Sequence, residues 1–385
     1  MLLLQPSDFR FSGSFHEASL TFLGARLNVL LSLNDVSHHA YIARRSFSIA
    51  AALLSLFHIL STDILAQPTN LTFEHFLLDV TSPLWVPSIY QDRTGYLWFG
   101  TVNGAERYDG YSFELFSHQP GDSTVASWVE TMYEDRAGNM WLGTSRGLDK
   151  VEASSGRFRH YTPNPKEPTH AWTNWVYAIH EDHDGTLLVG TGGGLHLLNP
   201  ATEAFTSLFH DSTDPGSISS NAVNAIHEDG SGALWIGTGG GLDRFDRATG
   251  EFIHYWHDAN SQRDDGFNSV YWVSNMYEDH SGVLWLGTNG ALVAFDQKTG
   301  RFTLYTHDPK NPGSLGDNNV TSICEDESGT LWVGTGGAGL DAFDRRFKRF
   351  SHYIHDANDP TSLSNNSVAF VYRERSGTLW IGTNG

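Results

Sequence analysis

A ten-residue pattern recurs seven times along this chain of 385 residues, and it limits the fold more than any other feature of the sequence. The copies follow the form D-x-x-G-x-L-W-x-G-T and lie at residues 92–101, 135–144, 182–191, 229–238, 279–288, 326–335 and 374–383. Their closing threonines are 43, 47, 47, 50, 47 and 48 residues apart. This period is typical of the four-stranded blades of a β-propeller.

Each repeat predicts four short strands, as the fourth copy illustrates. Apolar and polar residues alternate in 223–229, and further strand patterns follow at 234–238, 241–246 and 252–258. Asp229 and Gly232 mark the turn between the first two strands. An Asp side chain can accept hydrogen bonds from turn amides, and Gly adopts the positive φ that a tight hairpin requires.

The tryptophan of the repeated pattern is predicted to fill the space between neighbouring blades. The glycine that follows it is expected to let two backbones approach closely. In the third copy Leu188 stands in place of the tryptophan. A packing position tolerates this change, whereas a chemical role for the indole would not. The tryptophans are Trp98, Trp141, Trp235, Trp285, Trp332 and Trp380.

The ends of the chain indicate how the ring closes. Residues 73–76 fit the pattern of the fourth strand of a blade and precede the first complete repeat. The chain stops at Gly385, where the third strand of the last repeat begins, so we expect a longer natural protein. The predicted fold is all-β: a seven-bladed β-propeller of four-stranded antiparallel blades, with the last blade incomplete at the C-terminus and closed by the N-terminal strand.

Charge and composition disfavour several functions. The formal net charge of −20 repels phosphate groups, so nucleic acid is not an expected partner. Cys324 is the single cysteine and is expected to pack in the core. Of the 19 histidines, eight lie on predicted outer strands, and those on different blades cannot converge on one ion; His254 with His257 and His352 with His355 are the two local pairs that remain. No metal site and no cofactor is predicted.

The N-terminal region has the features of a secretory signal. Arg44 and Arg45 precede an apolar run at 46–57, and cleavage is expected after Ala66. The alternative is a membrane anchor, but the run is shorter than the roughly 20 residues that span a bilayer. We expect residues 1–45 to be a non-native or disordered extension, residues 46–66 a signal peptide and residues 67–385 the propeller domain.

The repeated sequence E-D-x-x-G-x-L-W-x-G-T-x-x-G-L-x-x-F-D resembles the two-component regulator propeller family from about residue 73 to the end of the chain. The resemblance implies an exported sensor region, followed in complete members by a second propeller, a small β-sandwich, a membrane helix and a cytoplasmic output module, often a histidine kinase. Many members sense carbohydrates. This chain would then be the first sensor propeller, at the periplasmic or extracellular face of a bacterial membrane, without an enzymatic core of its own.

A ligand site is predicted where the first strands of the blades begin. The residues just before the first Val of these strands are Trp85, Trp128, Trp175, Ala222, Trp272, Asn319 and Ser367. First strands line a propeller channel, so the four indoles are expected to surround one mouth. Aromatic faces stack on sugar rings, and carboxylates and amides bind hydroxyl groups. The remaining predicted ligand-binding residues are Glu130, Trp172, Asn174, Asn268 and Tyr271.

Packing of these indoles between blades is the alternative to ligand binding. For the whole chain, a ligand-sensing propeller competes with a propeller glycoside hydrolase or lyase and with a structural scaffold that binds protein. Glycoside hydrolysis needs two opposed carboxylates, whereas most acids here occupy repeated turn positions. No catalytic residue is predicted. The predicted partners are an oligosaccharide, the downstream propeller and signalling domains of the same protein and, in a homodimer, a second copy.

Overall fold

The computed structural model describes residues 2–4, 71–76, 85–116, 128–153, 155–164, 171–256 and 272–384. All strands belong to one compact unit that consists of Met1–Pro6 and Thr72–Gly385. Within the described part of the chain, no helix has the length and apolar character needed to cross a membrane.

Six repeats form complete four-stranded antiparallel blades, each from four consecutive strands. Blade 1 contains β3 (Ser88–Gln91), β4 (Leu97–Thr101), β5 (Gly104–Tyr108) and β6 (Phe113–Phe116). Blade 2 contains β7 (Val129–Glu134), β8 (Met140–Thr144), β9 (Gly147–Val151) and β10 (Phe158–Tyr161). Blade 3 contains β11 (Val176–Glu181), β12 (Leu187–Thr191), β13 (Gly194–Asn199) and β14 (Ala204–Leu208), preceded by the 3-10 helix η2 (Ala171–Asn174).

The second half of the unit continues the same order. Blade 4 contains β15 (Val223–Glu228), β16 (Leu234–Thr238), β17 (Gly241–Phe245) and β18 (Phe252–Trp256). Blade 5 contains β19 (Val273–Glu278), β20 (Val283–Thr288), β21 (Leu292–Asp296) and β22 (Arg301–Tyr305). Blade 6 contains β23 (Val320–Glu325), β24 (Leu331–Thr335), β25 (Leu340–Asp344) and β26 (Arg349–Tyr353). The strands predicted for the fourth repeat are confirmed to within two residues.

The last repeat contributes a partial sheet of two strands, β27 (Val368–Arg373) and β28 (Leu379–Thr383). The free edge of β28 pairs with β1 (Leu2–Leu4), and β1 pairs with β2 (Glu74–His75), so that the strand order is β2-β1-β28-β27. The outer position predicted for residues 73–76 is confirmed. The sequence predicts no strand within residues 1–45; β1 fills the position of the missing third strand, because backbone hydrogen bonds at a sheet edge demand no particular side chains.

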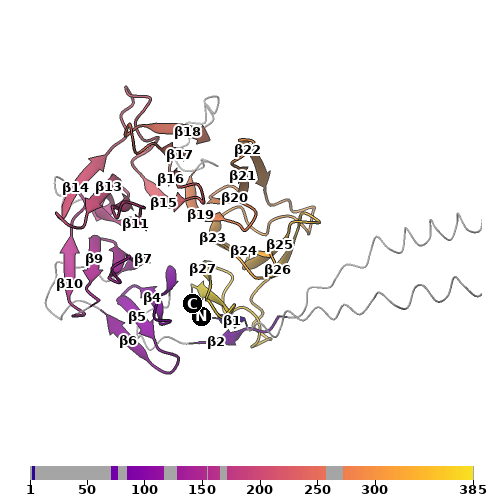
Figure 1. Ribbon diagram of the computed structural model, residues 1–385. Coiled ribbons are helices and arrows are strands. Elements are labelled where there is room, and N and C mark those ends of the chain that lie inside the picture. Colours follow the sequence, from indigo (N-terminus) through magenta and orange to yellow (C-terminus); the bar gives the residue numbers. More distant parts are fainter. Residues whose placement is uncertain are drawn as a thin grey trace, which may run out of the picture. The chain divides into compact units, whose positions relative to one another are not determined.

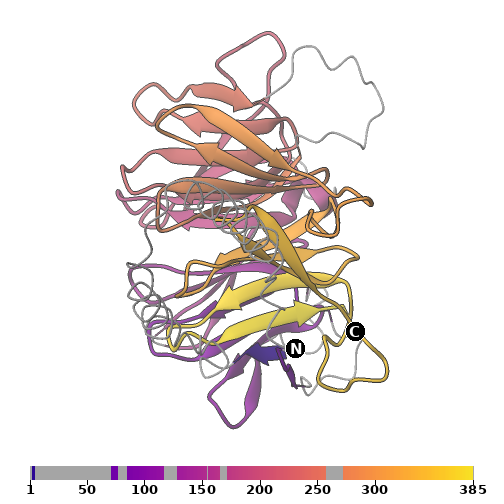
Figure 2. The same ribbon diagram turned by 90° about the vertical axis from the view of Figure 1, so that its right-hand side faces the viewer.

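The sheets surround a central axis, as Figure 1 shows. The first strand of each blade contacts the first strand of the next, and β27 contacts β3, so the ring closes. The seventh sheet joins the two ends of the described chain: in Figure 2 the indigo strand lies beside the yellow strands. At the joint, the Tyr372 hydroxyl accepts a hydrogen bond from the amide of Gln91 at 3.0 Å.

The core lies between the blades, where the repeated tryptophans pack. The Trp235 indole of blade 4 contacts the ring of Phe295 in blade 5, with centroids 5.2 Å apart. Its Nε1 donates a hydrogen bond to Asp229 Oδ2 at 2.7 Å, while Asp229 Oδ1 accepts the turn amides of Ser231 and Ala233. The predicted packing role of the tryptophan and the predicted turn role of the Asp are both confirmed. Gly232 has the predicted positive φ, at 83°.

In six repeats the glycine of the pattern lies against a Val at the start of the next blade, as predicted, whereas Gly287 lies against Asn275 of its own blade. A methyl group at Gly237 would lie 2.7 Å from Cγ1 of Val273, and one at Gly382 would lie 2.5 Å from the carbonyl oxygen of Val86. Such separations are too short for non-bonded carbon atoms. The contact between Gly382 and Val86 brings the last repeat against blade 1 and thereby repeats the arrangement found inside the ring.

Candidate ligand site in the central channel

A bulge in the first strand of the blades directs one side chain per blade into the channel. In six blades the pairing between the first and second strands shifts by one residue just after the Val that begins the first strand, as between Val223 and Ala225. The Val is buried in the blade. The next residue has no partner in the register and turns toward the channel, because a bulge re-aims the extra side chain. These residues, with Pro87 of blade 1, are Glu130, Tyr177, Asn224, Ser274, Thr321 and Ala369.

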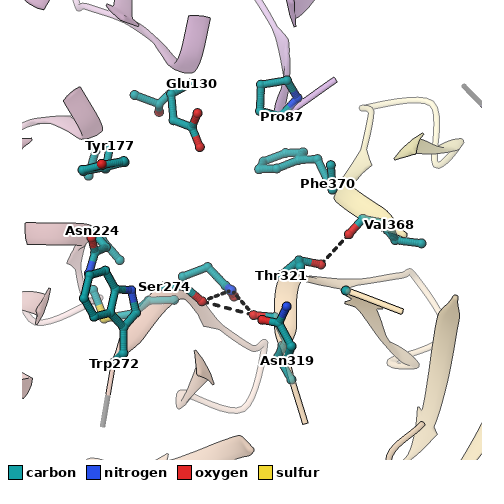
Figure 3. Close-up of a pocket in the computed structure, with 18 of the residues that line it drawn as sticks. Pro87, Glu130, Tyr177, Asn224, Trp272, Ser274, Asn319, Thr321, Val368 and Phe370 are labelled. Atoms are coloured by element: carbon teal, nitrogen blue, oxygen red, sulfur yellow. Dashed lines mark hydrogen bonds between the residues drawn. The ribbon is translucent and has the colours of Figure 1, made fainter. Parts of the chain in front are cut away.

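These side chains surround a cavity of about 560 Å³. Figure 3 shows Glu130, Tyr177 and Asn224 on one side and Pro87 and Phe370 on another, all around the same open space. The volume lies in the range of small-molecule sites. The lining mixes aromatic, amide and hydroxyl groups, and it therefore suits a polar ligand that also has an apolar face.

Three of the four predicted indoles form one continuous cluster across blades 1 to 3. The ring centroids of Trp85 and Trp128 are 4.5 Å apart and those of Trp128 and Trp175 are 5.3 Å apart, both edge to face. Trp175 then stacks on Tyr177 at 5.7 Å. Trp85 lines the cavity, and so does Trp272 of blade 5, which is 37% exposed.

The other predicted residues are placed differently. Trp172 lies on η2 and is 56% exposed, but it does not line the cavity. Asn174 is only 2% exposed and its side-chain oxygen accepts a hydrogen bond from the amide of Asn164 at 2.8 Å. It therefore fixes the backbone of Asn164 against η2. Asn268 and Tyr271 lie outside the described residues.

Glu130 has an unusual electrostatic environment. Its Oε2 accepts a hydrogen bond from Trp128 Nε1 at 3.0 Å. Burial raises the pKa of the Glu130 carboxyl to about 7, although the indole N–H groups of Trp128 and Trp175 partly offset this rise. The Nε1–H group of Trp175 is buried and is not placed to form a hydrogen bond with the Glu130 carboxylate. The pKa of the Tyr177 hydroxyl is raised too, first by burial and then by the charge of Glu130.

Sequence reasoning found Glu130 but missed its equivalents Tyr177, Asn224, Ser274 and Thr321. A signal was present. The residue after the Val differs in every repeat, while the residues around it recur. A position that varies inside a regular repeat serves something other than the common fold.

Three of the outer histidines, His160, His254 and His352, pair with carboxylates of their own blades, while His210, His307 and His355 bond to backbone carbonyls. His254 Nδ1 lies 2.6 Å from Asp243 Oδ1 in blade 4, and the same pair recurs as His352 with Asp341 in blade 6. In blade 3 the position of the Asp is taken by a buried histidine, His196, and burial lowers the pKa of its imidazole to about 4. The carboxylate pairs and His196 connect the third and fourth strands of single blades.

Comparison with known proteins agrees with the fold. Six segments match the family described as Two component regulator propeller, at residues 82–103, 125–146, 172–193, 217–240, 266–290 and 314–337. Over 69 residues, the chain is 38% identical to Histidine kinase P4 of Formosa agariphila. That match covers 18% of this chain and 5% of the kinase.

Solved structures give a wider match. The extracellular domain of a protein from B. thetaiotaomicron, described as the hybrid two component system BT3049, is 28% identical with a TM-score of 0.63, over 79% of this chain and 39% of that one. The extracellular domain of BT4673 from the same organism is 22% identical with a TM-score of 0.68, and the match covers 81% of this chain and 39% of that domain. This chain thus spans about two fifths of either domain.

The fold also occurs in an enzyme. A streptogramin B lyase is 16% identical with a TM-score of 0.60, over 81% of this chain and 94% of the lyase, and at this identity the likeness shows the fold alone. The repeat matches are more specific than this likeness in fold. The chain carries two-component regulator propeller repeats and is similar to the extracellular domains of hybrid two-component systems.

Proposed function

We propose that this chain is an exported sensor propeller that binds a small ligand in its central channel. The observation that carries the proposal is the ring of differing side chains, one from each blade, around a cavity of about 560 Å³. A structural scaffold would have no use for such variation at a channel-facing position. The similarity to extracellular domains of two-component systems supports a position outside the cytoplasm, with downstream signalling domains of the same protein as partners.

The ligand that fits this lining is an oligosaccharide. Trp85 and Trp272 contribute aromatic rings to the lining. Asn224, Ser274 and Thr321 contribute amide and hydroxyl oxygens, which can accept hydrogen bonds while their donors bond to carbonyls of the next blade. Sugars present apolar ring faces beside hydroxyl groups, and proteins bind them with this combination. The site is positioned by the rigid inner strands of the ring, so little ordering is required when a ligand binds.

The test is a glycan array followed by calorimetry on the purified propeller. Trp272→Ala is expected to weaken binding on the order of tenfold or more, because stacking on an indole is lost. The control is Tyr111→Ala, since Tyr111 is 96% exposed and lies away from the cavity. Equal binding by both variants, or no glycan bound by the native chain, would contradict the proposal.

An enzyme is the second outcome that this experiment distinguishes. Among the described residues that line the cavity, Glu130 is the one carboxylate. Hydrolysis of a glycoside uses two carboxylates on opposite sides of the bond. Binding without turnover of the array hit is therefore expected. Hydrolysis of the bound glycan would instead identify an enzyme. A propeller that binds no glycan but binds the downstream domains of the same protein would be a scaffold.

A further inference from the structure

Glu130 differs from three other acids of the inner strands, which each pair with an arginine. Near the opposite end of the same strands, Glu134 pairs with Arg93, Glu228 with Arg247 and Glu325 with Arg345. Glu130 instead receives a hydrogen bond from the Trp128 indole. Among the described residues that line the cavity there is no Lys, Arg or His. The carboxylate therefore faces the cavity without a compensating charge from the protein.

Aromatic residues lie beside this carboxylate and along the same cavity. The Trp128 indole donates a hydrogen bond to Glu130, and the charge of Glu130 contributes to the raised pKa of Tyr177. Trp85 packs against Trp128 and lines the cavity. Aromatic faces attract organic cations when these lie within about 6 Å of the ring centre. A carboxylate beside several aromatic rings is the combination that recognises ammonium groups, because charge and cation–π attraction act together in a partly desolvated site.

We infer that the channel ligand carries a positively charged ammonium group, which is held by Glu130 together with the rings of Tyr177 and Trp85. This inference rests on the proposed channel function and adds the charge of the ligand to it. A protonated amino sugar has the required chemistry. Sulfated sugars and uronic acids have the wrong sign for this site, and the net charge of −20 repels them further.

The test compares two oligosaccharides of the same length that differ in charge. One consists of N-trimethylated glucosamine, whose positive charge does not change with pH, and the other of neutral N-acetylglucosamine. Calorimetry on the whole chain at pH 8 is expected to show the cationic form binding on the order of tenfold more tightly. In Glu130→Gln this preference disappears. The matched control is Glu251→Gln, which removes an exposed outer carboxylate and leaves the preference intact.

The pH dependence provides a second measurement. Besides Glu130, the titratable group that lines the described cavity is Tyr177, whose pKa is raised by burial and by the charge of Glu130, so that its hydroxyl does not contribute to the change between pH 6 and pH 8. Since the Glu130 pKa is about 7, the affinity for the trimethylated sugar should be about tenfold lower at pH 6 than at pH 8. The Glu130→Gln variant should show a flat profile.

Each result bears on the inference separately from the proposed function. Equal binding of the two sugars overturns the cationic ligand but leaves a sensing channel in place. If the protein binds other, neutral glycans on the array but neither of the two glucosamine oligosaccharides, the cationic ligand is likewise overturned and the sensing channel remains. If no sugar of any charge binds, both the inference and the proposed function fail. A cationic preference that persists in Glu130→Gln places the charge recognition elsewhere and overturns the inference.

Discussion

At the scale of single residues, the same repeat contains positions that the sequence explains fully and positions that it explains only in part. The role of Asp229 in its turn follows from the spacing to Gly232 alone. Its bond to the Trp235 indole does not, because the sequence cannot show that the second carboxylate oxygen points into the blade. Glu130 was identified as a candidate site residue, but its burial among indoles requires the ring to close.

The raised pKa of Glu130 predicts a pH-dependent loss of stability. A carboxyl whose pKa rises from 4.5 in the unfolded chain to about 7 in the native state disfavours folding once it ionises. This loss begins as the pH rises through 4.5 and is complete above 7. It amounts to at most about 3 kcal/mol at pH 8, from about 1.4 kcal/mol for each pH unit.

Denaturant unfolding at several pH values checks this expectation. The Glu130→Gln variant should be more stable than the native chain at pH 8, and the difference should shrink toward pH 4.5. Glu251→Gln, which changes an exposed carboxyl outside the channel, is the matched control. A Glu130→Gln difference that is constant across this range would mean that the carboxyl titrates normally.

At the scale of elements, the repeat predicts four strands and the turns between them, because each strand has its own pattern and each turn its own residues. The bulge after the first Val was not predicted. The one extra residue places Val223 and Ile226 on the same face at a spacing of three residues, and this spacing was interpreted as part of a regular strand. The interlocking of neighbouring blades was predicted from the glycine of L-W-x-G-T, since only close approach explains a glycine in the middle of a sheet.

Substitution of this glycine is expected to separate two blades. In Gly237→Ala, the new methyl group would lie 2.7 Å from Val273 Cγ1 and 3.1 Å from the Ala225 side chain. Overpacking of this kind typically costs about 1–3 kcal/mol. Gly230→Ala is the control, because no atom lies within 4 Å of the added methyl group there and the turn is exposed. Chemical denaturation that shows equal stability for both variants would contradict the close approach.

At the scale of the whole molecule, the number of repeats and their period predict a ring, and the structure confirms contact between its first and last members. The completion of the last blade could be predicted only in part. Residues 73–76 carry the pattern of an outer strand, whereas Leu2–Leu4 carry no pattern that distinguishes them from other apolar segments.

Closure predicts that the joint between the last repeat and blade 1 matters as much as an internal joint. Trp380 packs on Phe99 of blade 1 with ring centroids 5.7 Å apart, as Trp235 packs on Phe295. Trp380→Leu and Trp235→Leu should therefore each destabilise the protein by about 2–4 kcal/mol. Both variants should still fold, because Leu188 already occupies the same position in blade 3. Thermal unfolding measures both, and a negligible effect of Trp380→Leu alone would indicate an open ring.

The extra residue in the inner strands has a consequence for how such proteins diversify. The paired residues of these strands carry the hydrogen bonds and the packing, so a change there disturbs neighbouring blades. The bulged residue has no partner in this pairing. In three blades its side chain, Asn224, Ser274 or Thr321, donates a hydrogen bond to a backbone carbonyl of the next blade, but the residue type differs from blade to blade, so the fold accepts exchange at this position. A new chemical specificity in the channel needs only a handful of such exchanges, and one scaffold can serve sensors for many different molecules.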